Sequence, residues 1–403
     1  MSHRQNFLPN QDTAHAGKIL WKHRRNPMAI THFTFEAEPL AAFVRFGYDL
    51  YHEDTSWIPP LQKQVYAQLS PDSPFFQKPG NCHRNFLVKA RNKVIGRISA
   101  MVNQDLKDQE GIPLGTIGFF ECVNDPSVAQ DLLSYSTQWL RQEKGIHRIW
   151  GPMNFDIWHS YRLMTKGFDQ KLFYGEPYNK AYYRDFFEEN DFIAKYYWDS
   201  VEITEPETIA KMVLPYAERY RFLVKRGYHF KRFNMKKFKR ELRKLHFVLT
   251  RSFNGFLGFT PISLSEFMQL FEKSRYAFHP QLFTFIYDEH NVLAGFSAAL
   301  LELSDAIRAM NGKDSLRAKL KFIYNRRRVN RINFYITGIT PEEAKKKTGS
   351  GRAGYYYIMH QILKEGFETV LLALMAKGNR AHKLLAEDAP KPQREYALYE
   401  LNL

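Results

Sequence analysis

The stretch from Thr340 to Gly354 contains residue types that could hold a phosphate-bearing ligand. Its cations and glycines are closely spaced, at Lys345, Lys346, Lys347, Gly349, Gly351 and Arg352. It lies between a predicted strand at 332–339 and a predicted helix at 355–364. Glycines and small residues between a strand and a helix leave backbone N–H groups free to surround an anion, and lysine adds positive charge. The pattern predicts a diphosphate-binding loop, with a flexible, solvated basic loop as the alternative.

A second candidate region, 151–183, combines polar and aromatic side chains in a long loop. Loops of this kind carry function more often than they merely connect elements. His159 and Glu176 are the candidate general bases, because an imidazole or a carboxylate with a raised pKa accepts a proton near neutral pH. The alternatives are a partly exposed loop histidine and a glutamate paired with a neighbouring lysine.

Glu121 is a third candidate, because the strand that carries it is otherwise apolar. Its neighbours in sequence are Ile117, Phe119, Phe120 and Cys122. Burial among such side chains would raise the pKa of the carboxyl, which is common at functional sites. An arginine-paired residue at the end of a strand is the alternative.

The elements that must position these residues repeat along the chain. Each half reads as strand, helix, hairpin, strand, helix and strand. The strings Val94–Ala100 and Val292–Ala298 are similar, and their glycines, Gly96 and Gly295, are 199 residues apart. The repeat predicts a duplicated mixed α/β (α+β) unit. The predicted parts are a basic N-terminal tail at 1–30, a first domain at 31–200, a junction at 201–226 and a second domain at 227–403.

The first half lacks the glycine loop. After its central strand the chain reads Glu121-Cys122-Val123-Asn124-Asp125-Pro126. A carboxylate repels a diphosphate, and proline removes a backbone amide. We therefore expect the first half to shape an acceptor site rather than to bind a diphosphate.

The strand, loop and helix of the second half resemble the acyl-CoA loop of the GNAT superfamily of N-acyltransferases, (Gln/Arg)-x-x-Gly-x-(Gly/Ala). The string from Lys346 to Gly351 matches this motif with lysine in its first position, and Asn379–Leu384 is similar to the start of the family's following helix. The resemblance implies that the loop amides hold the CoA pyrophosphate and that the preceding strand splays from its neighbour to admit the pantetheine arm. The cofactor-binding residues it implies are Ile339, Lys346, Lys347, Thr348, Gly349, Ser350, Gly351, Arg352 and Asn379.

The whole chain resembles a group of bacterial tandem-GNAT proteins. The resembling strings lie at 54–61, 71–76, 96–98, 118–121, 151–154 and 177–179. The resemblance implies a transferase that moves an acetyl or longer acyl group from CoA to a primary amine, with no metal. A lipid or sphingoid-type amine is the narrower candidate acceptor. Asn154, Tyr178 and Asn179 are the predicted substrate-binding residues.

The chain departs from the family pattern at the proton donor. Many GNAT enzymes place a tyrosine seven residues after the helix-opening asparagine, where this chain has Ala386. Tyr396 and Tyr399 on the last predicted strand are the candidate acids in its place. Two other classes of function stay as alternatives: an aminoacyl-tRNA-dependent transferase and a non-catalytic tandem-GNAT binding protein.

Net charge and composition indicate which classes of binding partner are favoured. The chain has 58 lysines and arginines against 42 acidic residues, a formal net charge of +16. Basic runs at 225–244 and 326–331 add to the loop cations. The surplus favours CoA phosphates, with an anionic membrane as the second partner and nucleic acid disfavoured. The aromatic fraction of 15% fits an acyl-chain pocket and a large core equally well.

Cysteine usage and hydropathy predict the compartment. The two cysteines, Cys82 and Cys122, form no CxxC or Cys/His cluster, so neither a disulfide framework nor a metal site is predicted. The N-terminus has no signal-peptide core, and no apolar run approaches the roughly 18 residues of a spanning helix. We expect a cytoplasmic protein, with peripheral contact at the inner membrane face as an option.

Overall fold

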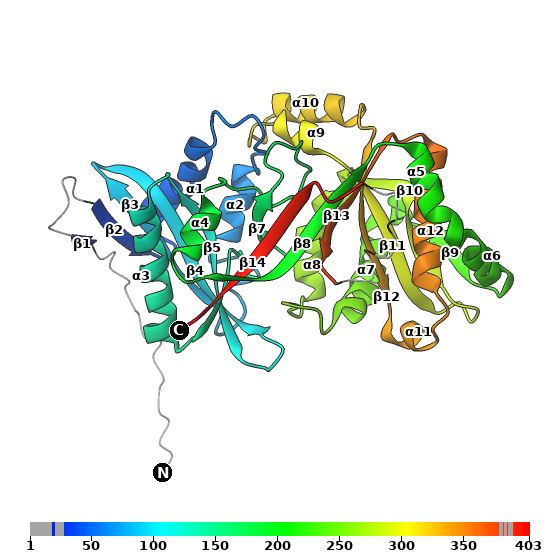
Figure 1. Ribbon diagram of the computed structural model, residues 1–403, viewed down its shortest axis with the longest axis horizontal. Helices are drawn as coiled ribbons and strands as arrows, with labels where there is room; N and C mark the ends of the chain where they lie inside the picture. Colours follow the sequence, from blue (N-terminus) through cyan, green and yellow to red (C-terminus); the bar gives the residue numbers. More distant parts are fainter. Residues whose placement is uncertain (1–17, 21–27, 379–381, 383–384, 386–389) are drawn as a thin grey trace, which may run out of the picture.

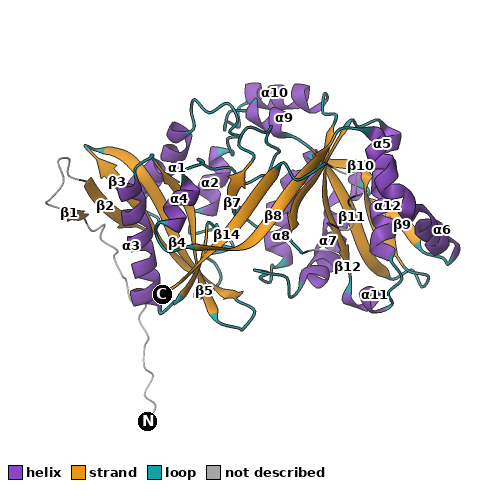
Figure 2. Ribbon diagram, in the orientation of Figure 1, coloured by secondary structure: helices purple, strands orange, loops and turns teal. Residues whose placement is uncertain are grey.

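The computed structural model describes residues 18–20, 28–378, 382, 385 and 390–403. In this part of the chain, one 14-stranded mixed sheet extends through the molecule, and helices pack on its faces (Figure 1, Figure 2). The mixed α/β fold predicted from the sequence is confirmed.

The first half of the chain, residues 28–203, forms one side of the molecule together with a short preceding strand. The strands are β1 (Lys18–Leu20), β2 (Met28–Phe33), β3 (Cys82–Ala90), β4 (Lys93–Lys107), β5 (Pro113–Cys122), β6 (Arg148–Gly151), β7 (Leu163–Lys166) and β8 (Ile193–Ile203). The helices are α1 (Ala37–Leu50), α2 (Gln62–Gln68), α3 (Pro126–Lys144) and α4 (Tyr183–Glu188).

The second half, residues 206–402, forms the other side. Its strands are β9 (His229–Arg232), β10 (Phe278–Tyr287), β11 (Leu293–Leu301), β12 (Arg331–Ile339), β13 (Thr369–Ala376) and β14 (Arg394–Asn402). Its helices are α5 (Pro206–Val213), α6 (Ala217–Lys225), α7 (Phe238–Phe253), α8 (Leu264–Phe271), α9 (Ser304–Arg308), α10 (Leu316–Arg326), α11 (Pro341–Lys345) and α12 (Ser350–Glu365). The segment 201–226, predicted as a junction, therefore contains the end of β8 and two helices.

The two halves repeat the same central strands. In the first half, Gly96 of β4 pairs with Cys122 at the end of β5. In the second half, Gly295 of β11 pairs with Ile339 at the end of β12. Each of these central strands then has a parallel neighbour, β6 or β13. The glycine spacing read from the sequence thus marks equivalent positions of the two sheets.

The closing strands of the two halves are exchanged. The strand order is β1-β2-β3-β4-β5-β6-β14-β8-β13-β12-β11-β10-β9, and β7 also pairs with β14. The last strand of the chain, β14, thus lies beside β6 of the first half, and β8 lies beside β13 of the second half. Figure 1 shows these two strands, red and green, crossing the middle of the molecule together. The exchange joins the two sheets into one.

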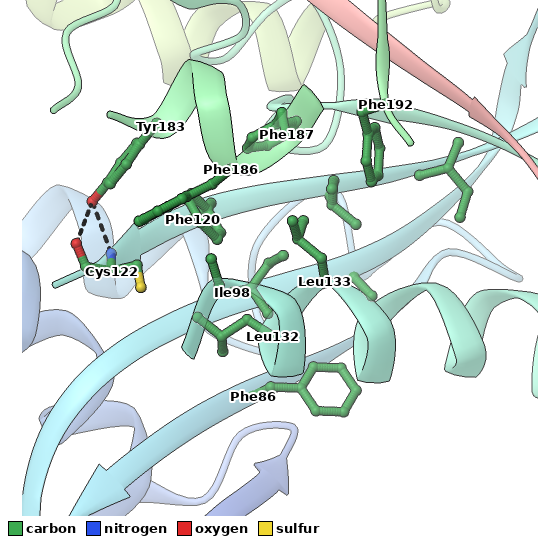
Figure 3. Packing of buried hydrophobic residues seen from close by; sticks show 14 of the residues in the cluster. Phe86, Ile98, Phe120, Cys122, Leu132, Leu133, Tyr183, Phe186, Phe187 and Phe192 are labelled. Atoms are coloured by element: carbon green, nitrogen blue, oxygen red, sulfur yellow. Dashed lines mark hydrogen bonds between the residues drawn. The ribbon is translucent and has the colours of Figure 1, made fainter. Parts of the chain in front are cut away.

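Aromatic side chains fill the core of the first half. Figure 3 shows side chains from β3, β4, β5, α3 and α4 meeting there, among them Phe86, Ile98, Phe120, Leu132, Leu133, Phe186 and Phe187. Phe120 and Phe187 meet edge to face at 5.3 Å between ring centroids, a favourable arrangement of two aromatic rings. Much of the aromatic excess is therefore core.

Helix α7 carries the last part of the basic run 225–244. It buries Phe238, Leu242, Leu245 and Val248 against the sheet at helical spacing. Lys239, Arg240 and Arg243 of this helix are exposed. This part of the run is therefore the solvent side of an amphipathic core helix.

Candidate functional site

The parallel strands β12 and β13 separate in the middle of the sheet. They pair from Arg331 to Phe334 on β12 and from Thr369 to Leu372 on β13. Beyond these residues the described strands do not pair with each other, because β12 stays with β11 while β13 pairs with β8 through Met375 and Ala376. Backbone groups on the facing edges of the two strands are therefore open to an extended ligand.

A β-bulge lies where the strands separate. Ala299 pairs with Phe334 and Ala298 pairs with Ile336, so Tyr335 is the extra residue on β12. A bulge re-aims the side chains around it. Phe334 packs in the core beside Tyr355 of α12. Ile336 instead packs against the hydrophobic cluster that contains Phe238 and Leu242 of α7.

The glycine loop lies at the open end of this gap. Gly349 adopts a φ of 80° and is the N-cap of α12, where it has no side chain of its own to cap the helix. The Thr348 hydroxyl accepts a hydrogen bond from the Ser350 N–H at 3.2 Å. Gly351 lies against β12, since a Cβ on it would be 3.1 Å from Ile339 Cγ1. A helix start with a glycine N-cap, next to separated strands, is suited to a diphosphate joined to an extended arm.

One loop cation is already paired. Lys346 Nζ lies 2.7 Å from Asp288 Oδ2 and 3.3 Å from Glu343 Oε2. Glu343 is buried and accepts hydrogen bonds from the hydroxyls of Thr348 and Tyr228. Lys346 therefore holds the loop in place, which is a different task from the anion contact that the motif implied.

Exposed cations surround the same loop. Lys345, Lys347 and Arg352 are exposed. The Arg219 side chain of α6 lies beside Gly349, with its Cδ 3.3 Å from where a Cβ would stand. Sequence reasoning missed Arg219, because it lies 130 residues before the glycine and no motif marks it.

The equivalent gap in the first half is filled by the chain itself. β5 and β6 pair only at Gly115–Ile149 and Thr116–Trp150. Beyond them, the Asn154 Oδ1 atom accepts a hydrogen bond from the Phe119 N–H at 2.8 Å, within the gap. The start of α3 is also occupied, because Asp125 Oδ1 accepts from the Ser127 N–H at 2.9 Å. Asn154, predicted to bind substrate, thus closes this gap.

A group of aromatic side chains adjoins the bulge on the face of the sheet opposite α12. This group, the Tyr335 cluster, contains Tyr161, Tyr174, Trp198 and Tyr335. Tyr174 and Tyr335 keep 47% and 52% of their surface exposed. Desolvation by the surrounding protein raises the pKa of each hydroxyl. The Arg162 guanidinium belongs to the same group and lies over Tyr161 and Trp198 at 3.8 and 4.4 Å from the ring centroids.

Glu176 lies in a buried network of charged side chains at the start of β14. Its side chain and that of Arg394 are both fully buried, with Arg394 Nε 3.3 Å from Glu176 Oε1. The Tyr396 hydroxyl and the Phe173 N–H donate hydrogen bonds to the two carboxylate oxygens. Burial raises the pKa of Glu176 to about 7, although Arg394 opposes the shift. The carboxyl can therefore change protonation near neutral pH, but it lies away from solvent.

This shift predicts a pH-dependent stability. Because the folded-state pKa of Glu176 is about 7 and its ordinary value is 4.5, the group's contribution to stability is present below pH 4.5 and is lost as the pH rises to 7. In the Glu176→Gln variant this loss disappears. We expect the unfolding free energy of the variant, relative to the wild type, to rise by on the order of 3 kcal/mol between pH 4 and pH 8. Urea titrations of both proteins across this range measure it, and a pH-independent difference would contradict the assignment.

His159 is held by a buried carboxylate. Its Nδ1 lies 2.8 Å from Asp156 Oδ1, and the same oxygen accepts from the Trp158 N–H at 3.0 Å. The loop reaches the second half, where Thr260 donates to Asp156 Oδ2 at 3.3 Å. The contact fixes the orientation of the imidazole and leaves Nε2 as the ring nitrogen that does not contact Asp156.

A second histidine–aspartate pair lies beside β13. The His382 Nε2 atom is 2.9 Å from Oδ1 of Asp199, a buried residue of β8 that pairs with Met375 just beyond the strand separation. His382 Nδ1 is buried without a hydrogen-bond partner in the described part of the chain. Asp199 points to the α12 face, since Val201 on the same side of β8 packs with α12. No spacing in the sequence pairs these two residues, which are 183 positions apart.

The remaining predicted residues hold the first half together. Glu121 accepts hydrogen bonds from the Tyr51 and Tyr183 hydroxyls and lies 3.8 Å from Arg97, while burial raises the pKa of its carboxyl. Tyr399 is buried in the first-half core, and its hydroxyl donates to Glu188. Both therefore lie away from the strand separation.

Tyr178 and Asn179 fix the long loop. The Tyr178 hydroxyl donates to Asp54 Oδ2 at 2.9 Å, and the Asn179 Oδ1 atom accepts from the Met164 N–H of β7 at 2.7 Å. Asn379, implied as a cofactor contact, lies outside the described residues. Within the described residues there is no group of three or more side chains suited to a metal ion, and no helix long and apolar enough to cross a membrane.

Comparison with known proteins identifies the fold. No protein-family model matches the chain. It is 22% identical over 305 residues to Protein YghO of Escherichia coli (strain K12), covering 73% of this chain and 74% of that protein. It is 25% identical over 279 residues to the bacterial ceramide synthase of Caulobacter vibrioides (strain NA1000 / CB15N), covering 68% of this chain and 70% of that protein.

Among solved structures, a tandem GNAT protein from the clavulanic acid biosynthesis pathway is similar over 93% of this chain and 98% of that chain, with a TM-score of 0.51 and 9% identity. This chain contains two repeats, each with a register shift in its central strand pair, and the second repeat has separated parallel strands and a glycine loop. The chain is therefore a protein of the tandem GNAT fold.

Proposed function

We propose that the chain is an acyl-CoA-dependent N-acyltransferase with one cofactor site, in the second half. The observation that carries the proposal is the contrast between the halves. In the second half the strands separate and α12 has a glycine N-cap, whereas in the first half Asn154 fills the gap and the Asp125 carboxylate caps α3. Acyl-CoA would supply an activated thioester carbonyl.

The chain's own residues divide the remaining work between two faces of the sheet. The helix start and the cations around Gly349 bind the diphosphate, and the open edges of β12 and β13 orient the extended arm. On the face opposite α12, the Tyr335 cluster and Arg162 receive the acceptor amine. His159, oriented by Asp156, accepts the proton that the amine must lose before it attacks, because Glu176 is fully buried beside Arg394.

A long-chain amine is the acceptor we favour. The Tyr335 cluster contains the aromatic rings of Tyr161, Tyr174, Trp198 and Tyr335, which suit an apolar chain with a polar end. The similarity to a bacterial ceramide synthase supports the same class of acceptor.

An acyl-length series tests the function directly. Purified protein is incubated with acetyl-, octanoyl- or palmitoyl-CoA and with a short or a long-chain primary amine, and free thiol and N-acyl product are measured together. The proposal expects equal amounts of thiol and amide, with the largest rate for the long-chain amine. Thiol without amide would indicate hydrolysis alone. Absence of both products with every pair would favour a binding protein or a transferase that uses aminoacyl-tRNA.

His382 is proposed as the proton donor to the departing CoA thiolate, because it lies on the α12 face beside the strand separation. The variants His382→Asn and Asp199→Asn should each lower kcat about 10²-fold with little change in the KM for acyl-CoA. The control is His360→Asn, an exposed histidine of α12 that stacks on Tyr356. A wild-type kcat in both the His382 and the Asp199 variants would remove the pair from the mechanism.

A further inference from the structure

Helix α10 exposes an apolar stripe to solvent. The exposed fractions of its large side chains are 75% for Leu316, 60% for Leu320, 47% for Ile323 and 56% for Tyr324. These positions fall on one side of a helix by their spacing. Ala318 and Phe322, by contrast, are buried against the second-half core. The helix thus has an apolar face that nothing in the described chain covers.

Cations border this stripe. From Lys313 to Arg328 the chain carries seven lysines and arginines and a single acidic residue, Asp314. Lys319 pairs with Asp314 at 3.2 Å, and the Arg328 guanidinium lies over the Tyr324 ring at 4.1 Å from its centroid. Arg317 and Lys321 are exposed next to the leucines. An apolar helix face flanked by cations is the pattern of a helix that lies in the interface of an anionic bilayer.

Hydrogen bonds to the first half hold α10 on the outside of the molecule. Figure 1 shows α10 at the periphery of the molecule, outside α9. The connection between the two helices is fixed to the first half, where the Gly312 carbonyl accepts from the Gln62 N–H at 3.1 Å and Arg308 donates to the Ser56 carbonyl at 3.2 Å. The connection that carries α10 is therefore held to the first half by hydrogen bonds.

We propose that α10 is the surface by which this protein docks on a membrane containing anionic lipids. Charge selects this partner over a second copy of the chain, because two α10 faces meeting would bring the two cation sets together. It also selects anionic over neutral lipid. The docking surface does not depend on the chemistry proposed above.

The docked orientation would place the bilayer on the side of the molecule that carries Tyr174 of the Tyr335 cluster. The segment at the start of α9 contacts the loop with Tyr174, since the Tyr174 N–H donates to Glu302 Oε1 at 2.8 Å and Lys171 pairs with Asp305 of α9 at 2.9 Å. A long-chain amine could then reach the proposed acceptor site from the lipid phase without crossing bulk water. This consequence rests on the proposed function, whereas the docking itself does not.

Vesicle sedimentation tests the docking. Full-length protein is mixed with vesicles of phosphatidylcholine alone, or with 30 mol% phosphatidylglycerol, at low and high salt. We expect binding only to the anionic vesicles, weakened by salt. Leu320→Glu should weaken binding about tenfold or more, and the double variant Arg317→Glu/Lys321→Glu by a similar factor. The matched control is Ile193→Glu, since Ile193 is 69% exposed at the far end of β8 and should bind as the wild type does.

Three outcomes would overturn the proposal. The first is equal binding to neutral and anionic vesicles, and the second is equal loss of binding in Ile193→Glu and Leu320→Glu. The third is a dimer in light scattering that Leu320→Glu converts to a monomer, which would make the face a protein interface. Since Leu320 is exposed, its variant should keep the wild-type thermal shift with acyl-CoA, so failure of docking is distinguishable from failure of the cofactor site.

Discussion

Replacing Gly351 by glutamate should abolish the stabilisation of the protein by acyl-CoA. A side chain at this position starts 3.1 Å from Ile339 Cγ1 and puts a carboxylate at the start of α12, where the diphosphate is proposed to bind. A ligand at 100 times its Kd adds about 2.7 kcal/mol to the unfolding free energy of the wild type, and the variant should gain none of it. Thermal melts with and without palmitoyl-CoA measure both values.

The first half offers a matched control. Asn124 is exposed in the loop that leads into α3, the place equivalent to the glycine loop. Asn124→Glu adds the same charge, and we expect it to keep the full ligand-induced shift because that loop is proposed not to bind CoA. An unchanged shift in Gly351→Glu, or a lost shift in Asn124→Glu, would place the cofactor elsewhere.

Replacing Arg394 by methionine should destabilise the folded protein by about 3–5 kcal/mol. Arg394 is fully buried between Glu176 and Glu202, with its Nη2 atom 3.1 Å from Glu202 Oε2. Its removal leaves carboxylates without their cation, and one of them has no access to water. Chemical denaturation at pH 8, where Glu176 is mostly ionised, gives the largest effect.

The neighbouring surface pair is the control for this loss. Lys166 lies 3.5 Å from Glu395 Oε1, and its side chain is 64% exposed. Lys166→Met should change the unfolding free energy by less than about 1 kcal/mol, because water screens exposed pairs. An equal loss of unfolding free energy in both variants would mean that burial does not explain the contribution of the Arg394 network to stability.

Features encoded by neighbouring residues could be predicted from the sequence. The glycine loop depends on Gly349 and Gly351 within a few positions of a strand and a helix, and the duplication is visible in the order of elements. The absence of such a loop in the first half is equally local, because Asp125 caps its own helix. These features need no knowledge of which strands meet.

Features that depend on distant pairing could not be predicted. Nothing in the sequence distinguishes β8 from β14 as the neighbour of β13, since either closing strand could pair within its own half. The sequence predicts Glu176 as a general base, with pairing to a neighbouring lysine as the alternative, whereas its partner is Arg394 on the exchanged strand. Lys346 looked like a free cation because Asp288, its partner, lies in another hairpin.

Features of the proposed acceptor side also depend on distant pairing and could not be predicted from the sequence. The bulge at Tyr335 comes from a change of register between β11 and β12, and a register has no signature in one strand alone. Arg162 was within the region singled out for polar side chains, but its position over Trp198 depends on β8. Residues that line a site between two halves are therefore the hardest to read from a sequence.

The stoichiometry of CoA binding tests the central claim most directly. Isothermal titration of the full chain with CoA should give one site per chain, lost in Gly351→Glu and retained in Asn124→Glu. Two sites per chain would show that the first half also binds the cofactor, despite Asn154 and Asp125. No binding at all would contradict the assignment of the separated strands and the glycine loop as a cofactor site.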